Sequence, residues 1–127
     1  MTSSSNCRFS ETHEWSCAEG DVITLGLTPF AVNKLTDITY VEMKPAGTKV
    51  SLGESIGEVE SVKTTSDIYA SVDGEILEVN IEAARDPSII NADPIGKGWL
   101  VKIRANDASQ LDSLMDKATY DAKHPVS

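Results

Sequence analysis

The sequence predicts a mainly β fold, a sandwich or barrel of short strands with helical pieces on its surface and at its end. Its 127 residues fit one domain, 1–127, and 40% are hydrophobic against 24% charged, as in ordinary soluble globular chains. A strand-like unit occurs twice, at residues 53–59 and 74–79. We interpret the repeat either as chance similarity between hairpins or as two half-barrels related by approximate two-fold symmetry, with a hairpin tip at Lys63.

The first elements are expected to be a hairpin and a short helix. A turn at 19–21 separates a Trp-bearing segment from 21–27, which reads as the second strand. Thr28 and Pro29 then predict the start of a helix that runs to about residue 35, because threonine caps helices and proline is tolerated at the first helical position.

The middle of the chain is expected to be a series of short strands separated by turns. Residues 38–43 are rich in β-forming types, and the chain turns at Pro45-Ala46-Gly47. Further strands are expected at 48–52, 55–61, 67–71 and 74–80.

The last third is expected to mix helical turns with one strand. Residues 81–91 read as helical turns broken at Pro87, and residues 98–103 as a buried strand. The tail from Asp107 is predicted to be one helix, capped by Asp107 with Gln110 three residues on, and with one apolar face formed by Leu111, Leu114 and Met115. Residues 124–127 are expected to fray, and 1–8 and 121–127 to be flexible ends.

The charge balance excludes several classes of partner. Eleven Lys and Arg residues stand against twenty Asp and Glu, for a net charge of −9. Such a surface repels phosphates, so nucleic acid and anionic membranes are poor partners. No apolar run approaches the roughly 20 residues that span a bilayer. Partners with a basic docking face are favoured instead.

The cysteines and histidines give little sign of catalysis or metal binding. Cys7 and Cys17 do not make a disulfide framework, and we expect both as reduced thiols. His13 and His124 are the only histidines, so no metal site and no catalytic nucleophile–base pair is legible, and an enzyme is the least expected class. Residues 1–10 lack the apolar core of a secretory signal and make a poor mitochondrial presequence.

One segment of the sequence presents a lysine in a polar turn. Residues 61–66 are small and turn-like, with Lys63 inside them and strand-like segments on both sides. A lysine at a tight exposed turn offers other proteins a single handle. Spacing alone favours an ordinary solvated lysine, with Glu58, Glu60 and Asp67 as balancing surface charge.

The residues from Glu60 to Tyr69, Glu-Ser-Val-Lys-Thr-Thr-Ser-Asp-Ile-Tyr, resemble the lipoyl-attachment motif of the glycine cleavage system H protein family. That pattern is E-S-V-K-A-x-S-D-[IV]. Matches in family order and spacing run from about residue 9 to residue 120. They are His13-Glu14-Trp15, Gly26-Leu27-Thr28, Asp73-Gly74-Glu75-Ile76, Glu78-Val79-Asn80, Ile90-Asn91, Asp93-Pro94, Gly98-Trp99 and the helix at 111–120.

The resemblance implies a lipoyl-domain-like barrel-sandwich hybrid with short helices and a C-terminal helix. It implies lipoic acid in amide linkage on Lys63, within a motif whose other members are Glu60, Ser61, Val62, Ser66 and Asp67. Glu14 and the short helix that carries Lys34 would border the cleft for the loaded arm. Trp15 and Trp99 are expected in the core, and His13 in a packing or hydrogen-bonding role.

The resemblance also implies a carrier role in glycine catabolism and one-carbon metabolism, not an enzymatic one. The lipoyl arm would accept an aminomethyl group from a pyridoxal-phosphate glycine decarboxylase and present it to a tetrahydrofolate-dependent aminomethyltransferase. A dihydrolipoamide dehydrogenase would reoxidise it, and lipoyl-transferring enzymes would install it. The chain is expected to be a monomer, cytoplasmic in a bacterium or in the mitochondrial matrix or a related organelle in a eukaryote, and not secreted.

The sequence departs from the family pattern in four places. Lys34 stands where some members carry a histidine, and Thr36 replaces a common glycine. Met43-Lys44-Pro45-Ala46 replaces an L-P-E-x stretch, and Ile95 stands where an aromatic is common. A cation at position 34 would repel the protonated amine of a loaded arm, so contact between the two is in doubt.

Two other readings remain open. The chain could be an H-like lipoyl donor for 2-oxoacid dehydrogenases, or an unmodified binding module of the same fold. A biotin carrier is disfavoured, because that family flanks its lysine with methionines and here the neighbours are Val62 and Thr64.

Overall fold

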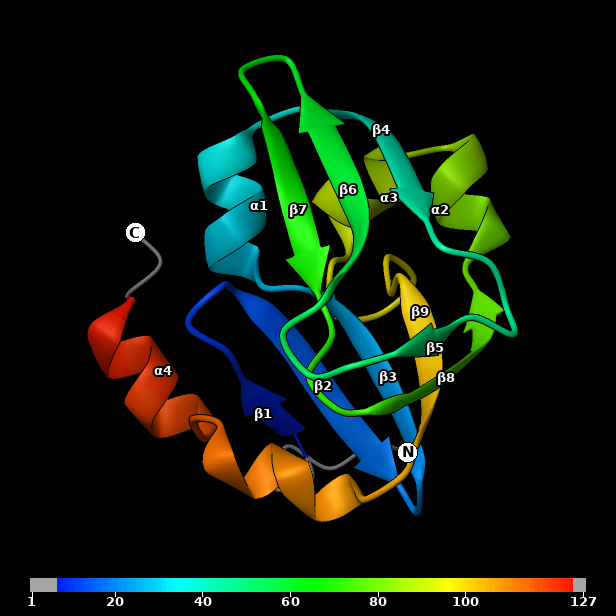
Figure 1. The fold of residues 1–127 in the computed structure, drawn as a ribbon. Helices are drawn as coiled ribbons and strands as arrows, with labels where there is room; N and C mark the ends of the chain where they lie inside the picture. The colour runs from blue at the N-terminus through cyan, green and yellow to red at the C-terminus, as the bar shows by residue number, and fades with distance from the viewer. Residues whose placement is uncertain (1–6, 125–127) are drawn as a thin grey trace.

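The computed structural model describes residues 7–124, which form two antiparallel sheets packed face to face, with helices at the margins (Figure 1). The larger sheet has six strands in the order β1-β2-β3-β9-β8-β5. In chain order its strands are β1 (Cys7–Phe9), β2 (Glu14–Glu19), β3 (Val22–Leu27), β5 (Lys49–Val50), β8 (Gly74–Val79) and β9 (Val101–Ala105). This confirms the predicted mainly β fold.

The smaller sheet has the order β4-β6-β7 and carries the lysine hairpin. Its strands are β4 (Ile38–Met43), β6 (Ser55–Ser61) and β7 (Thr65–Tyr69). The two copies of the repeated unit fall in β6 and β8, and each is the middle strand of an antiparallel trio, β4-β6-β7 or β5-β8-β9. The repeat therefore occupies equivalent places in the two sheets.

Two apolar clusters lie on opposite faces of the larger sheet. The main cluster fills the space between the sheets with aliphatic side chains, among them Ile23, Leu25, Ile56, Val59, Ile68, Ile76 and Ile103. Because side chains alternate along a strand, Trp15 and Cys17 of β2 point to the outer face and Ser16 to the inner one, where its hydroxyl donates to Ser71 Oγ at 2.8 Å. The outer cluster holds Cys7, Phe9, Trp15, Cys17 and Tyr120.

The helical pieces predicted at 28–35 and at 81–91 are confirmed. Helix α1 (Pro29–Leu35) begins where Thr28 Oγ1 accepts the Ala31 N–H at 3.2 Å. The predicted break at Pro87 separates α2 (Ile81–Arg85) from α3 (Ser88–Ala92). All three helices lie in the half of the molecule that carries the smaller sheet, α1 alongside the hairpin and α2 and α3 beside β4 (Figure 1).

The prediction of one continuous C-terminal helix is wrong. A 3₁₀ helix (Ala108–Ser113) is followed by an extended stretch and then by α4 (Lys117–Lys123). The chain is extended there because Met115 exchanges two backbone hydrogen bonds with Phe9 of β1, at 2.8 and 3.0 Å. Asp107 caps the 3₁₀ helix as predicted. The Gln110 side chain instead contacts another segment, where its amide donates to Asp73 Oδ2 at 2.9 Å.

The expectation of two reduced thiols is also wrong: Cys7 and Cys17 form a disulfide. Sequence reasoning assigned residues 7–9 to no strand, whereas they form β1, the edge strand beside β2. The register places Cys7 directly opposite Cys17 on the outer face, with the Cα atoms 4.0 Å apart.

Several boundaries differ by a few residues. The strand expected at 48–52 is only β5, and the buried strand expected from 98 begins at Val101. Within the ends expected to be flexible, residues 7–8 lie in β1 and residues 121–123 in α4. Residues 1–6 and 125–127 lie outside the described residues.

Thr36 ends α1 in a backbone conformation that suits glycine, with φ 64° and ψ −133°. The Asn91 amide holds this corner, since it donates to Thr36 O at 2.7 Å and accepts the Ile38 N–H at 2.9 Å. The Thr36 departure from the family pattern therefore falls where a Cβ is costly.

Replacing Thr36 with glycine is expected to stabilise the fold. Relief of the positive-φ strain outweighs the extra backbone entropy of glycine, for a net gain of about 1 kcal/mol in the free energy of unfolding. Urea unfolding followed by circular dichroism measures it. Thr36→Ala is the matched control, because it keeps the Cβ and should show no gain. A Thr36→Gly variant less stable than the wild type would contradict the prediction.

Candidate functional site

Lys63 lies at the tip of the β6–β7 hairpin, the part of the ribbon that projects furthest at the top of Figure 1. The side chain of Ser61 shapes the turn, because its Oγ accepts the N–H groups of Lys63 and Thr64, each at 3.1 Å. The Ser61 N–H donates to Thr64 O at 2.8 Å and closes the loop. Lys63 is exposed, and within residues 7–124 no hydrogen bond or ion pair engages its ammonium group.

The tip is also tied to the body of the molecule. The Val62 N–H donates to the carbonyl of Asp37 at 3.0 Å, just after the corner at Thr36. The Val62 side chain remains 66% exposed. Backbone contact thus holds the turn, while the side chains of Val62 and Lys63 stay free for a partner.

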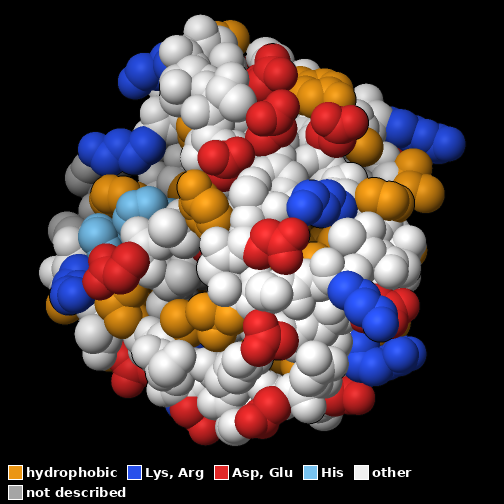
Figure 2. Space-filling view, viewed as in Figure 1, with side chains coloured by type: hydrophobic (Ala, Val, Ile, Leu, Met, Phe, Trp, Pro, Cys, Tyr) orange, Lys and Arg blue, Asp and Glu red, His pale blue; other side chains and the backbone are white. Residues whose placement is uncertain are grey.

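An acidic face lies directly below this tip. Glu58 of β6 pairs with Glu42 on one side and with Asp67 on the other, and Glu60 pairs with Tyr40 and Thr65. Figure 2 shows acidic side chains gathered over this part of the molecule. Like charges directly opposite each other across strands are destabilising. The carboxylates at positions 42, 58 and 60 raise the pKa of the Tyr40 hydroxyl, chiefly Glu42.

Glu14 is a buried carboxylate that joins the turn before β2 to the hairpin. It is 2% exposed, and its oxygens accept Ser10 Oγ–H at 2.6 Å, Thr12 Oγ1–H at 2.5 Å and the Tyr69 N–H of β7 at 3.2 Å. Burial raises the pKa of the Glu14 carboxyl, against the opposing effect of these donors. The carboxylate oxygens of Glu14 thus have hydrogen-bond donors from two hydroxyl groups and one backbone N–H.

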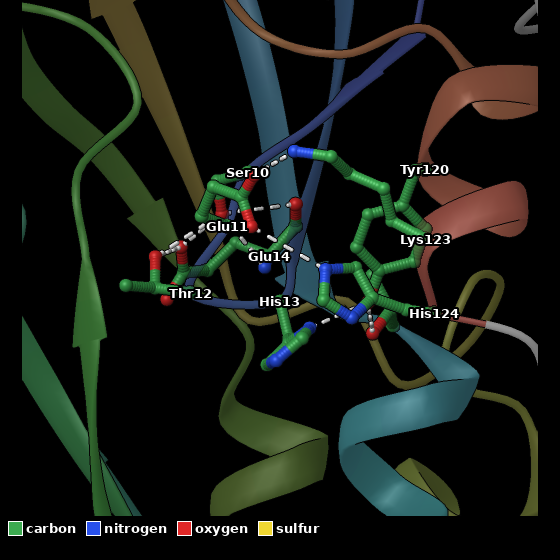
Figure 3. Close-up of polar contacts among 9 residues, drawn as sticks. Ser10, Glu11, Thr12, His13, Glu14, Tyr120, Lys123 and His124 are labelled. Carbon is green, nitrogen blue, oxygen red and sulfur yellow. Dashed lines mark hydrogen bonds and ion pairs between the residues drawn. The ribbon is translucent and has the colours of Figure 1, made fainter.

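The neighbouring His13 faces away from Glu14, toward α4 (Figure 3). His13 Nδ1 and Tyr120 Oη lie 2.8 Å apart, and Tyr120 Oη lies 2.8 Å from Thr28 Oγ1. The His13 ring also stands 4.7 Å, between centroids, from the rings of Phe30 and His124. Burial and the nearby charge of His124 lower the pKa of His13. The expected packing and hydrogen-bonding role of His13 is confirmed.

Lys34 is exposed on α1, where its ammonium lies 5.4 Å from the centroid of the Phe30 ring. It therefore shares the Phe30 and His13 neighbourhood, whereas no described contact joins it to Glu14. Phe30 also lines a groove of about 840 Å³ on the outer face of the larger sheet. Neither Glu14 nor Lys34 is among the residues that line that groove.

The structure thus brings most of the predicted motif together at one end of the molecule. Glu60, Ser61, Val62, Lys63, Ser66 and Asp67 form the hairpin, and Glu14 contacts its second strand through Tyr69. Sequence reasoning missed Ser10 and Thr12 as donors to Glu14. Two hydroxyl residues just before a glutamate in a turn are the signal that could have identified them.

The predicted core positions of the two tryptophans are confirmed in part. Trp15 is 3% exposed and its Nε1–H donates to Pro94 O at 2.9 Å. Trp99 is half-buried against the outer cluster, with the Lys102 ammonium 5.1 Å from its ring centroid.

Within the described part of the chain, no group of three or more His, Cys, Asp or Glu side chains is arranged to hold a metal ion. Over the same residues, no helix has the length and apolar character needed to cross a membrane.

Comparison with known proteins identifies a family of similar chains. A family model described as Glycine cleavage H-protein matches residues 7–125. Proteins named glycine cleavage system H protein are similar: that of Thermus thermophilus is 45% identical over 112 residues, covering 88% of each chain. That of Acinetobacter baumannii is 43% identical over 122 residues, covering 96% of this chain and 98% of its own.

A solved structure agrees with these sequences. The crystal structure of a glycine cleavage system H protein from Mycobacterium marinum superposes with a TM-score of 0.86 at 36% identity. The match covers 95% of this chain and 98% of that one.

The buried Glu14 is expected to make stability depend on pH. An unfolded glutamate ionises near 4.5, and the folded carboxyl ionises at higher pH. Between these values the unfolded state binds fewer protons, so the contribution of Glu14 to stability falls as pH rises. The neutral amide of Glu14→Gln lacks this dependence. Relative to that variant, the wild type should therefore lose stability as pH rises above about 4.5.

Urea unfolding of both proteins across this pH range tests the prediction, since other titrating groups cancel in the difference. Glu19→Gln, at an exposed glutamate on the same strand, is the matched control for the loss of one carboxylate. A stability difference between wild type and Glu14→Gln that stays flat or grows with pH would refute the assignment.

Proposed function

Because the chain belongs to the glycine cleavage H-protein family, we propose that it is the lipoyl carrier of a glycine cleavage system and that lipoate is attached to Lys63. The observation that carries the proposal is the position of this lysine, exposed at the tip of a turn whose backbone is held by Ser61 and Asp37. Attachment through an amide needs an amine that a modifying enzyme can surround, and the hairpin presents one.

The residues around Lys63 fit the group. The ammonium has no partner among the described residues, so acylation breaks no contact of the fold. The amide removes one positive charge and changes the net charge from −9 to −10. Because the backbone of the turn is held in place, a lipoyl arm on Lys63 would move about one defined attachment point.

When bound to Lys63, the lipoyl group would supply the carrier chemistry, because its dithiolane can accept an aminomethyl group and can be reoxidised from the dithiol once the one-carbon unit and ammonia have left. We propose as partners a pyridoxal-phosphate glycine decarboxylase, a tetrahydrofolate-dependent aminomethyltransferase, a dihydrolipoamide dehydrogenase and the lipoyl-transferring enzymes. The chain itself contributes presentation, docking and shelter, as a carrier and not an enzyme.

The acidic face is proposed to dock those enzymes at the hairpin. Glu58 and Glu60 flank the buried Val59 on β6, so both side chains point to the outer face, below Lys63. The pairing of Glu58 with Glu42 and Asp67 across the sheet costs stability, and no counter-charge lies beside these carboxylates among the described residues. A basic patch on a partner would offset this repulsion and steer the encounter.

Glu14 is proposed to receive the loaded arm near the base of the hairpin. Its carboxylate is held by the Ser10 and Thr12 hydroxyls, which can rotate or withdraw to admit a cationic amine, while the Tyr69 N–H fixes its position. Lys34 contacts Phe30 and repels such an amine, so we place it at the margin of the cleft and not in contact with the arm. We further propose that the chain acts as a monomer, which leaves the hairpin free for successive partners.

Lys63→Arg is expected to abolish lipoylation and leave the fold intact. Arginine keeps the charge but offers no amine for the amide bond, and substitutions at exposed positions usually change stability by about 0.5 kcal/mol or less. Intact-mass measurement after incubation with lipoate, ATP and a lipoate ligase checks it. Lys34→Arg is the control and should gain one lipoyl group. Lipoylation of the Lys63→Arg protein would show that the attachment site lies elsewhere.

Neutralising the acidic face is expected to slow lipoylation. The double variant Glu58→Gln, Glu60→Gln should raise the ligase KM several-fold with little change in kcat, because charged rim residues act mainly on encounter. Glu75→Gln, Glu78→Gln on β8 changes the net charge equally and serves as control. The effect should weaken as salt is added. Equal KM values for the two double variants would contradict a docking role for this face.

A further inference from the structure

The disulfide between Cys7 and Cys17 lies outside the site described above and has no role in it. It lies on the outer face of the larger sheet, in the cluster with Phe9, Trp15 and Tyr120. Both cysteines also line the groove of about 840 Å³, whose other walls include Trp99 and Thr24. A volume of this size suits a small organic molecule, and aromatic walls favour an apolar one.

The disulfide fastens a short edge strand. β1 has three residues and pairs on one side with β2. Strands this short at a sheet edge are the first elements to open, since few hydrogen bonds hold them. The cross-link to Cys17 ties β1 to a strand that is itself paired along its whole length with β3.

β1 in turn holds the C-terminal tail, residues 107–124. Phe9 exchanges two backbone hydrogen bonds with Met115, at 2.8 and 3.0 Å, and its ring stacks on Tyr120 with centroids 5.2 Å apart. The Arg8 guanidinium adds an ion pair with Asp112 at 3.8 Å. Cys7 thus connects β1 to the sheet, and Arg8 and Phe9 connect β1 to the tail.

The tail has a second attachment, through polar contacts with the turn before β2 and with Thr28 at the start of α1. Tyr120 contacts Thr28 and His13, while Glu11 accepts from Lys123 at 2.8 Å and lies 3.4 Å from His124 Nε2 (Figure 3). The Glu11 contacts are exposed, and such pairs contribute little on their own. The apolar part of the docking, around Phe9 and Tyr120, therefore depends on β1.

We propose that Cys7 and Cys17 form a thiol–disulfide exchange site, reduced by a small apolar dithiol that enters the groove, and that the state of this pair controls the docking of residues 107–124 on β1. The proposal is independent of any modification of Lys63. It rests on the position of the cysteines in the groove wall and on the contacts that β1 makes with the tail.

The exchange balances with the dithiol alone. One thiolate of the dithiol attacks a cysteine sulfur, the bond between Cys7 and Cys17 breaks, and the other cysteine leaves as a thiolate and takes a proton. The second thiol of the reductant then attacks the reductant's own sulfur in the mixed disulfide, and the bonded cysteine leaves as a thiolate and takes a proton. The products are two cysteine thiols and the cyclic disulfide of the reductant, so two electrons pass to the protein.

Hydrogen exchange read by mass spectrometry tests the proposal on the full chain, with dihydrolipoamide as the dithiol. After reduction, amides of residues 107–124 should exchange about ten-fold faster or more, while those of β8 and β9 stay unchanged. Reoxidation should restore slow exchange. Alkylation of the thiols followed by intact mass reports the state of the pair in each sample.

Two sets of variants test the role of the disulfide and the role of the groove separately. Cys7→Ala, Cys17→Ala should exchange at the fast rate with or without the dithiol. Thr24 lies opposite Cys17 in the register and lines the groove, so Thr24→Phe should slow the reduction several-fold, and Thr24→Val, which is close in size to threonine, should not.

Three results would each overturn the proposal. The first is a fully reduced pair with unchanged exchange in the tail. The second is a disulfide that dihydrolipoamide reduces only after urea unfolds the chain. The third is a protein whose cysteines remain thiols under air oxidation.

Discussion

The site depends first on two hydrogen bonds to a single side chain, that of Ser61. Its hydroxyl oxygen accepts the N–H groups of Lys63 and Thr64, which would otherwise need water or another turn geometry. The turn therefore has one backbone arrangement with Lys63 at its tip. The Val62 N–H and the Asp37 carbonyl then fix that turn against the corner between α1 and β4. Without these hydrogen bonds, the backbone at Lys63 would have no fixed position relative to the sheet.

Below the tip, each layer of the fold supports the next. Ile56, Val59 and Ile68 bury the inner face of the hairpin, so its outer face can carry like charges that would be hard to tolerate elsewhere. Glu14, at the start of β2, links the first strands to β7 through the Tyr69 N–H. The tail, residues 107–124, contacts the turn before β2 through Tyr120 and His13. The strained Thr36 lies at the corner between α1 and β4, next to the Asp37 carbonyl that holds the hairpin tip, and Asn91 holds this corner.

Much of this could be predicted from local signals in the sequence. The Thr28-Pro29 helix start, the break at Pro87 and the hairpin around Lys63 follow from residues close in the chain. What could not be predicted depends on contacts between distant segments. Phe9 pairs with Met115 and interrupts the expected tail helix, and the β1–β2 register makes Cys7 face Cys17. Ser10 and Thr12 donate to Glu14 because the turn before β2 brings their hydroxyls to that buried carboxylate.

The central claim, that this chain is a carrier built around one modified lysine, is tested most directly by peptide mapping of protein isolated from its native source. Mass spectrometry of the digested protein should locate a single lipoyl group on Lys63 and none on any other lysine. A lipoyl group on a different lysine would contradict the account, as would a Lys63 that a lipoate ligase also fails to modify.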